Sequence, residues 1–168
     1  MKKNPTTLDS TVHRYFAVHF NQKVWQLLSK SSITIEEGYE LIDYAHASNL
    51  HWRYAGNQVN QQRGMYLIAR VFLAVGNPQA ALIYAQKCCD IANKNIAGIK
   101  DFDYAYAQEV MWKCQLALGN MHQAEKHKTA CEKFGNSIAN EEDKKLFLTD
   151  FNTEYKKIMK GSEKARLE

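Results

Sequence analysis

The sequence has 168 residues, of which 45% are hydrophobic and 24% charged, and its formal net charge is +4. A chain of this length can form one domain with a substantial core. Lysine and arginine are spread along it and no apolar run approaches the roughly 20 residues of a membrane span, which argues against nucleic-acid and membrane partners.

Apolar residues recur at helical spacing along the chain, and no alternating run predicts a strand. The first helix is expected to begin after Asp9, with apolar residues at four-residue steps from Val12 to Leu28. The fifth is expected to begin after Asp101 or Asp103. The predicted helices cover residues 10–29, 35–48, 52–75, 78–93, 102–118, 121–134 and 141–160.

Glycines and asparagines bear on where some of these helices start and stop. The third predicted helix carries Gly56 and Gly64 in its polar first half, and a glycine inside a helix costs about 1 kcal/mol relative to alanine. We therefore expect that half to start late, to bend or to project beyond its neighbours. Gly135 is expected to stop the sixth helix, Asn140 to cap the seventh, and Gly161 to end it.

A turn between two helices recurs at a fixed interval. Gly76 can end one helix, Asn77 can cap the next, and Pro78 fits the first position of that next helix. Gly119 and Asn120 repeat the pattern 43 residues later.

The same interval places Thr34 at the corresponding earlier position. Thr34, Asn77 and Asn120 are residue types that cap helices, and Glu37 and Gln123 complete a capping box in two of the three turns. The residues around the turns also match in chemical type. The apolar rows are Val24, Leu67, Val110; Trp25, Ile68, Met111; and Leu28, Val71, Cys114, and the small rows are Gly38, Ala81, Ala124 and Ala45, Cys88, Cys131.

A period of this size predicts stacked antiparallel helical hairpins in a single all-α domain. A last helix with one polar face would cap the stack. Trp25, Trp52 and Trp112 lie at helical positions and are expected to pack against other helices. The expected boundaries are residues 11–53, 54–96 and 97–139 for the repeats, 141–160 for the capping helix, and 1–7 and 162–168 for flexible termini.

The turn segment resembles the tetratricopeptide repeat, a family with an aromatic residue in the first helix of each hairpin, a glycine at the turn and small residues in the second helix. Gln115 replaces the aromatic residue in the third repeat, Ile33 replaces the glycine in the first, and the period of 43 exceeds the usual one of about 34 residues. The matching positions are Phe72, Gly76, Ala81 and Cys88 in the second repeat and Gly119, Ala124 and Cys131 in the third.

The resemblance implies a right-handed superhelix of hairpins that binds a partner on its concave surface. It implies neither enzymatic activity nor a cofactor. In such a stack the first helix of each hairpin lines the concave face.

Basic, aromatic and apolar side chains recur on one face of those first helices. Arginine can bind a carboxylate through two hydrogen bonds and tyrosine offers rigid contact area, so a peptide with an acidic group is the expected ligand. The alternative is that these are ordinary flank residues, solvated or packed on neighbouring repeats. The candidate partner-binding residues are Lys23, Lys30, Arg63, Tyr66, Arg70, Tyr106, Glu109 and Lys113.

No other pattern in the sequence indicates a chemical function. The histidine and cysteine spacings do not match a zinc site, and the sequence has no phosphate-binding loop or hydrolase motif. We therefore expect no metal, no cofactor and no enzymatic activity. The four cysteines show no disulfide pattern and the N-terminus lacks the apolar segment of a secretory signal, so we expect a reduced, cytoplasmic protein.

The leading hypothesis is therefore a non-enzymatic adaptor or scaffold module that binds a protein or peptide. The alternative is a regulatory sensor that binds a small ligand or signalling peptide through the polar segment from Asn57 to Arg63, where amide side chains could bond to a backbone. The oligomeric state stays open, and a homo-oligomer is one of the options.

Overall fold

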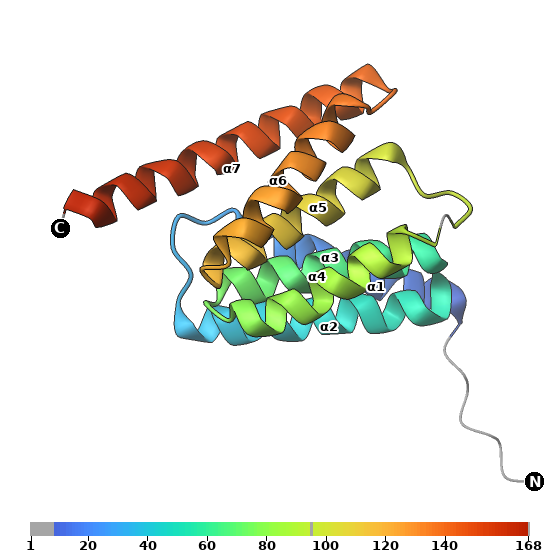
Figure 1. Ribbon diagram of the computed structural model, residues 1–168. Helices are drawn as coiled ribbons and strands as arrows, with labels where there is room; N and C mark the ends of the chain where they lie inside the picture. The colour runs from blue at the N-terminus through green and yellow to red at the C-terminus, as the bar shows by residue number, and fades with distance from the viewer. Residues whose placement is uncertain (1–8, 95, 168) are drawn as a thin grey trace, which may run out of the picture.

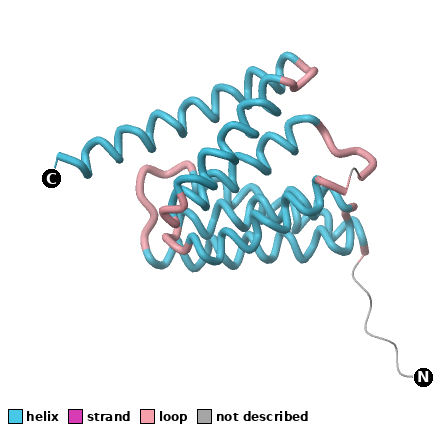
Figure 2. Tube along the Cα trace, in the orientation of Figure 1, coloured by secondary structure: helices cyan, strands magenta, loops and turns pink. Residues whose placement is uncertain are grey.

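The chain forms seven helices and no strand in the part that the computed structural model describes, which is residues 9–94 and 96–167, with side chains up to Lys156. Figure 2 shows helices joined only by loops and turns. The predicted all-α class is confirmed. The helices are α1 (Ser10–Leu28), α2 (Ile35–Ala55), α3 (Gln58–Ala74), α4 (Pro78–Ala92), α5 (Asp101–Ala117), α6 (Met121–Asn136) and α7 (Glu141–Leu167).

Side-chain caps fix several helix starts where the sequence predicts them. The Asp9 carboxylate accepts a hydrogen bond from the backbone N–H of Thr11 and starts α1. Thr34 and Glu37 form the expected capping box of α2, and Asn77 caps α4 through the N–H of Ala80. Each such cap satisfies N–H groups that have no partner within the helix, which contributes about 1 kcal/mol.

The boundary between α2 and α3 differs from the prediction. Helix α2 continues past Ser48 to Ala55, and α3 begins at Gln58 rather than near Trp52. The cause is a second capping box, in which the Asn57 side chain accepts from the N–H of Asn60 and the Asn60 side chain accepts from the N–H of Asn57. The late start was one of the outcomes expected for the polar half of this helix.

The two glycine turns have the same conformation 43 residues apart. Gly76 and Gly119 have φ of 76° and 75°, a left-handed backbone that glycine adopts without steric cost. In each turn the asparagine N–H bonds to a carbonyl five residues back, Asn77 to Phe72 and Asn120 to Gln115, which is the pattern of a glycine-terminated helix.

The Asn120 side chain does not cap α6, however. It donates to Gln115 Oε1 over 2.9 Å instead of accepting from the helix N–H groups. The expected capping box with Gln123 is therefore wrong.

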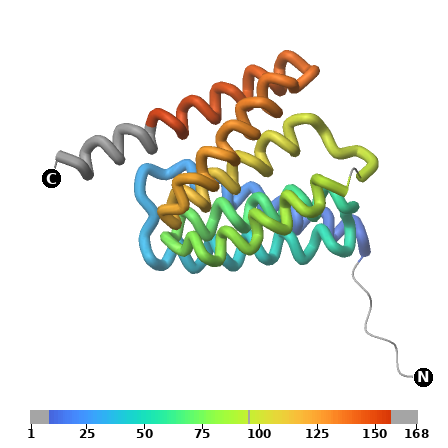
Figure 3. Tube along the Cα trace, in the orientation of Figure 1, coloured from blue at the N-terminus to red at the C-terminus, as the bar shows by residue number. Residues whose placement is uncertain are grey.

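The helices pair in sequence order as three hairpins. Contacts join α1 to α2, α3 to α4 and α5 to α6, and each hairpin also touches the next. Figures 1 and 3 show α1 to α4 along a common direction, with α5 and α6 inclined to it. One core cluster lies at each junction: the first joins α1, α2 and α3, the second α3, α4 and α5, and the third α5, α6 and α7. The odd-numbered helices also touch one another in order, α1 to α3, α3 to α5 and α5 to α7.

Helix α7 closes the end of the stack against α5 and α6. Asn140 caps it as predicted, accepting from the N–H of Asp143. Gly135 does not stop α6, because α6 continues to Asn136, and Gly161 lies within α7. A Cβ on Gly135 would overlap the Phe147 ring, so this glycine permits the close approach of α7.

The two ends of the chain, both predicted to be flexible, have different outcomes. The predicted flexible segment 1–7 lies outside the described residues, and α7 continues to Leu167 through most of the segment predicted to be flexible at the other end.

Within the described residues, none of the helices combines the length and the apolar character that crossing a membrane requires.

Candidate functional site

The odd-numbered helices carry two adjoining cavities on their shared side. The larger has a volume of about 530 Å³ and the smaller about 240 Å³, and both are lined by Trp25, Tyr66 and Tyr106. We call the two together the odd-helix groove. The larger cavity is completed by Arg70, Glu109, Asp150, Thr153 and Glu154, and the smaller by Asn21, Gln62, Arg63, Leu67, Phe102 and Asp103.

Glu109 of α5 is the centre of a charged network under the larger cavity. Its side chain is 3% exposed, and a carboxylate at such a depth requires partners. Lys113 of the same helix forms an ion pair with it. From α3, the Tyr66 hydroxyl donates to Glu109 over 3.2 Å, and Arg70 Nη1 lies 3.5 Å from it.

The network extends to α7, the helix predicted only to cap the stack. Lys113 Nζ also pairs with Glu154 over 2.9 Å, and the Tyr106 hydroxyl donates to Asp150 over 2.8 Å. Side chains of α3, α5 and α7 are therefore joined by charge-assisted hydrogen bonds, which are stronger than neutral ones.

A second ion pair lines the smaller cavity. Arg63 of α3 binds the 3%-exposed side chain of Asp103 with two hydrogen bonds, of 2.8 Å from Nε and 3.0 Å from Nη2. Asp103 also accepts from the backbone N–H of Lys100, at the start of α5. The bidentate capacity that suggested an acidic ligand for Arg63 is thus used within the chain.

Aromatic rings form the wall that the two cavities share. The Tyr66 and Tyr106 rings meet edge to face with centroids 5.5 Å apart, and Trp25 lies 6.5 Å from Tyr66. The Arg70 guanidinium lies 5.9 Å from the centroids of both Trp25 and Tyr66. This distance permits a cation–π attraction.

Burial keeps the two tyrosines protonated. It raises the pKa of Tyr66 well above its ordinary value, and the negative charge of Glu109 raises it further. Burial likewise raises the pKa of Tyr106, as does its hydrogen bond to Asp150. Burial acts to lower the pKa of Arg70, but Tyr66 and Glu109 outweigh it and the net pKa is raised. At neutral pH the groove therefore has two neutral hydroxyl donors and a charged arginine.

Six of the eight predicted partner-binding residues belong to this groove or its network. Tyr66, Arg70, Tyr106 and Glu109 line the larger cavity, Arg63 lines the smaller, and Lys113 joins through its ion pairs. The remaining two do not. Lys23 is exposed and lines neither cavity, and Lys30 pairs with Glu37 near the α1–α2 connection.

Sequence reasoning missed several lining residues, and Trp25, Asp150 and Glu154 are the most informative of them. Trp25 was expected to pack against other helices, but it is 40% exposed and lines both cavities. Asp150 and Glu154 belong to α7, outside the 43-residue repeats. Their spacing of four residues on one helical face was the available signal.

In the polar segment from Asn57 to Arg63, some residues have structural roles and others line the groove. Asn57 and Asn60 form the cap of α3. Gln62 is 1% exposed, and its Nε2 donates to the Asp103 carbonyl over 3.3 Å and to Cys88 Sγ over 3.1 Å. Its Oε1 is buried without a hydrogen-bond partner.

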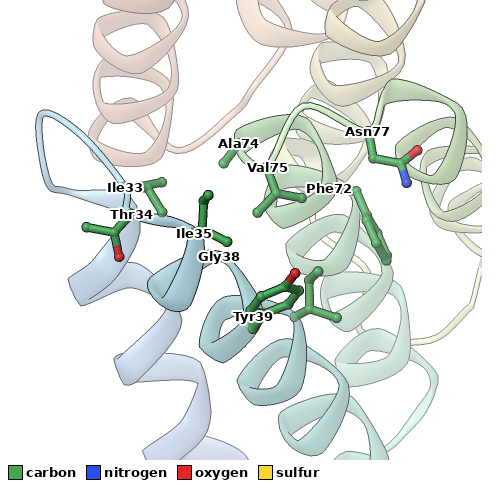
Figure 4. A pocket seen from close by; sticks show the side chains of 10 residues that line it. Ile33, Thr34, Ile35, Gly38, Tyr39, Phe72, Ala74, Val75 and Asn77 are labelled. Atoms are coloured by element: carbon green, nitrogen blue, oxygen red, sulfur yellow. The ribbon is translucent and has the colours of Figure 1, made fainter.

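A separate cavity of about 390 Å³ lies between the start of α2 and the α3–α4 turn (Figure 4). Figure 4 shows mainly aliphatic and aromatic side chains around it. Two of its polar side chains, Thr34 and Asn77, act as helix caps, and the third polar group is the hydroxyl of the exposed Tyr39. The walls therefore offer apolar contact and little chemical specificity.

Comparisons with known proteins yield no match, whether with protein-family models, with curated proteins or with solved structures. Among the residues that the structure describes, no group of three or more histidine, cysteine, aspartate or glutamate side chains could hold a metal ion.

Proposed function

We propose that the chain is a non-enzymatic helical-repeat module that binds a peptide or protein segment in the odd-helix groove. In this proposal it is a cytoplasmic, long-helix relative of the tetratricopeptide repeat family, and its hairpins stack as a right-handed superhelix with the groove on the concave side. The observation that carries it is the larger cavity, to which α1, α3, α5 and α7 all contribute side chains.

The composition of the cavity supports a binding role. Its volume of about 530 Å³ falls within the range of about 300–1,000 Å³ that is usual for ligand pockets. Aromatic faces combined with a few fixed charged groups give both contact area and orientation. The hydrogen bonds between helices hold these groups in place before a ligand arrives, which lowers the entropy cost of binding.

An acidic group on the partner stays a prediction. Arg63 is bound by Asp103, and Lys113 by Glu109 and Glu154. An acidic ligand would therefore compete with carboxylates that the chain already supplies.

Peptide selection on the full chain tests the proposed function. Peptides recovered from a random phage-displayed library would be synthesised, and their affinities for the wild type and for Trp25→Ala measured by calorimetry. Trp25 contributes an exposed aromatic face to both cavities, so we expect its loss to weaken binding by about tenfold or more, as for a central aromatic contact.

Tyr15→Ala is the matched control. Tyr15 is an aromatic residue of the same helix, is 63% exposed and lies outside the groove. Its replacement should leave the affinity within about twofold, as for a residue outside the contact. Equal affinities for the wild type and Trp25→Ala would show that the peptides bind elsewhere.

A further inference from the structure

We infer that the odd-helix groove takes a basic group, the side chain of a lysine or arginine in the bound segment. The inference rests on the proposed function and reverses the charge expected from the sequence. It depends on the charges at the rim, an unsatisfied acceptor on a residue that lines the smaller cavity, and the aromatic wall.

Among the described residues, the charged groups in and beside the larger cavity include more carboxylates than cations. Glu109, Asp150 and Glu154 face the two cations Arg70 and Lys113. Because both cations are already in ion pairs with these carboxylates, the surplus negative charge lies at the rim, on α7. A cation placed there gains attraction without displacing an existing pair.

Asp150 is the rim carboxylate best placed to receive that cation. It is exposed, and the Tyr106 hydroxyl donates to its Oδ2. No lysine, arginine or histidine side chain within the described residues forms an ion pair with it. Tyr106 fixes the orientation of the carboxylate, and the acceptor capacity that remains suits an ammonium or guanidinium group.

A residue that lines the smaller cavity carries a buried hydrogen-bond acceptor without a partner. The residue is Gln62 and the acceptor is its Oε1. The amide orientation is fixed because the Asp103 carbonyl can only accept, and so must receive its hydrogen bond from Gln62 Nε2. A buried acceptor without a donor is destabilising by about 1–3 kcal/mol. A ligand N–H that reached this oxygen would remove that cost.

The shared aromatic wall accommodates cations. Arg70 lies over the Trp25 and Tyr66 rings within the chain itself. The Tyr106 ring, next to Asp150, offers a further aromatic surface to the aliphatic part of a lysine or arginine side chain. The Asp150 carboxylate, the unpartnered Gln62 Oε1 and the aromatic wall together favour a ligand with a basic hydrogen-bond donor over a ligand with an acidic acceptor.

Acetylation of the ligand tests the sign of the charge. Each selected peptide that contains lysine would be made with its lysines free or acetylated and titrated against the full chain by fluorescence anisotropy. Acetylation removes the charge and keeps most of the shape, so we expect the affinity to fall by about tenfold or more. Arginine peptides would be compared with their citrulline forms.

Charge exchange at Asp150 locates the contact. Asp150→Asn should weaken binding of the free-lysine peptide by severalfold, and Asp150→Lys should abolish it. A peptide with glutamate in place of that lysine should regain binding to Asp150→Lys, which a misfolded variant could not show. The matched control is Glu142→Lys, which changes an exposed carboxylate of α7 outside the groove and should leave each affinity within about twofold.

The possible results separate the two proposals. Equal affinities for free and acetylated peptides, or a preference for acidic peptides, would overturn the basic-group inference while sensitivity to Trp25→Ala upheld the groove. Peptide affinities that are unchanged by the substitutions at both Asp150 and Trp25 would overturn the inference and the proposed function together.

Discussion

A carboxylate that is almost fully buried requires cations and hydroxyl donors around it. Glu109 meets this condition through Lys113, Arg70 and Tyr66. Tyr66 and Glu109 occupy equivalent positions of successive repeats, 43 residues apart. The repeat thus places a hydrogen-bond donor and its acceptor in register on neighbouring helices.

Replacing Glu109 should destabilise the protein. In Glu109→Ala the two cations and the Tyr66 hydroxyl lose their common acceptor, and breaking a buried ion pair costs about 3–5 kcal/mol. We expect the lower part of that range because Lys113 keeps Glu154. Urea unfolding monitored by circular dichroism would measure the loss of free energy.

Glu125→Ala serves as the comparison for this change. The Glu125 side chain is 70% exposed and pairs only with Lys128, over 3.6 Å, among the ion pairs of the described residues. Its loss should cost about 0.5 kcal/mol or less. Similar stability of the two variants would contradict the central role of Glu109.

At the residue scale, sequence periodicity cannot show whether a side chain faces solvent or a neighbouring helix, and Arg70 is an example. The pattern placed it correctly on the face shared by the odd-numbered helices. A flank position can face solvent or the next helix, however, and here the Arg70 side chain is 22% exposed and bound to Tyr66 and Glu109. A change of Arg70 to glutamate is therefore expected to affect stability as well as binding.

At the scale of the helices, the contact between α6 and α7 depends on the absence of one methyl group. Gly135→Ala should gain about 1 kcal/mol of helix propensity. The added Cβ would meet the Phe147 ring, which is fully buried, and such overpacking costs about 1–3 kcal/mol. Because the ring is packed in the core cluster of α5, α6 and α7, we expect a net loss, seen as a lower melting temperature.

A compensating substitution tests that explanation. Combining Gly135→Ala with Phe147→Leu should cost less than the sum of the two single changes, because the smaller side chain makes room for the methyl group. Additive losses would show that Phe147 does not limit the approach of α7.

Most helix ends could be predicted because capping is local chemistry. Thr34, Asn77 and Asn140 act within three or four residues of their own positions in the sequence. Gly135 was misassigned because its role depends on Phe147, a residue of the next helix. A glycine that ends a helix and one that permits close packing look alike in a single sequence.

At the scale of the whole molecule, burial protects all four cysteines. Burial raises the pKa of the Cys89 and Cys114 thiols to about 12 each, and it also raises the pKa of Cys88 and Cys131. The thiolate is the reactive form, and a higher pKa means less thiolate at neutral pH.

We therefore expect the thiols of the native chain to react with DTNB only as the chain unfolds. Labelling should be slow in buffer and rapid and complete in concentrated guanidinium chloride. Fast labelling of one thiol under native conditions would show that its helix opens locally.

The sequence predicted only part of the odd-helix groove. The 43-residue interval located the rows on α3 and α5, since equivalent positions of stacked hairpins fall side by side. It could not locate the contribution of α7, which lies outside the repeat, nor show that the basic residues are neutralised by Asp103, Glu109 and Glu154. Ion pairing between distant segments depends on tertiary geometry that a period does not contain.

The network around Glu109 affects how cooperatively the molecule unfolds. Stacks in which each repeat touches only its neighbours can lose a terminal repeat while the rest survives. Here the departure of α7 would leave Lys113 without Glu154, and the departure of the second hairpin would leave Glu109 without Arg70 and Tyr66. Separating α5 from α7 or from the second hairpin thus removes partners of buried charged groups, which favours cooperative melting of the second hairpin, the third hairpin and α7 over stepwise unfolding of that part of the stack.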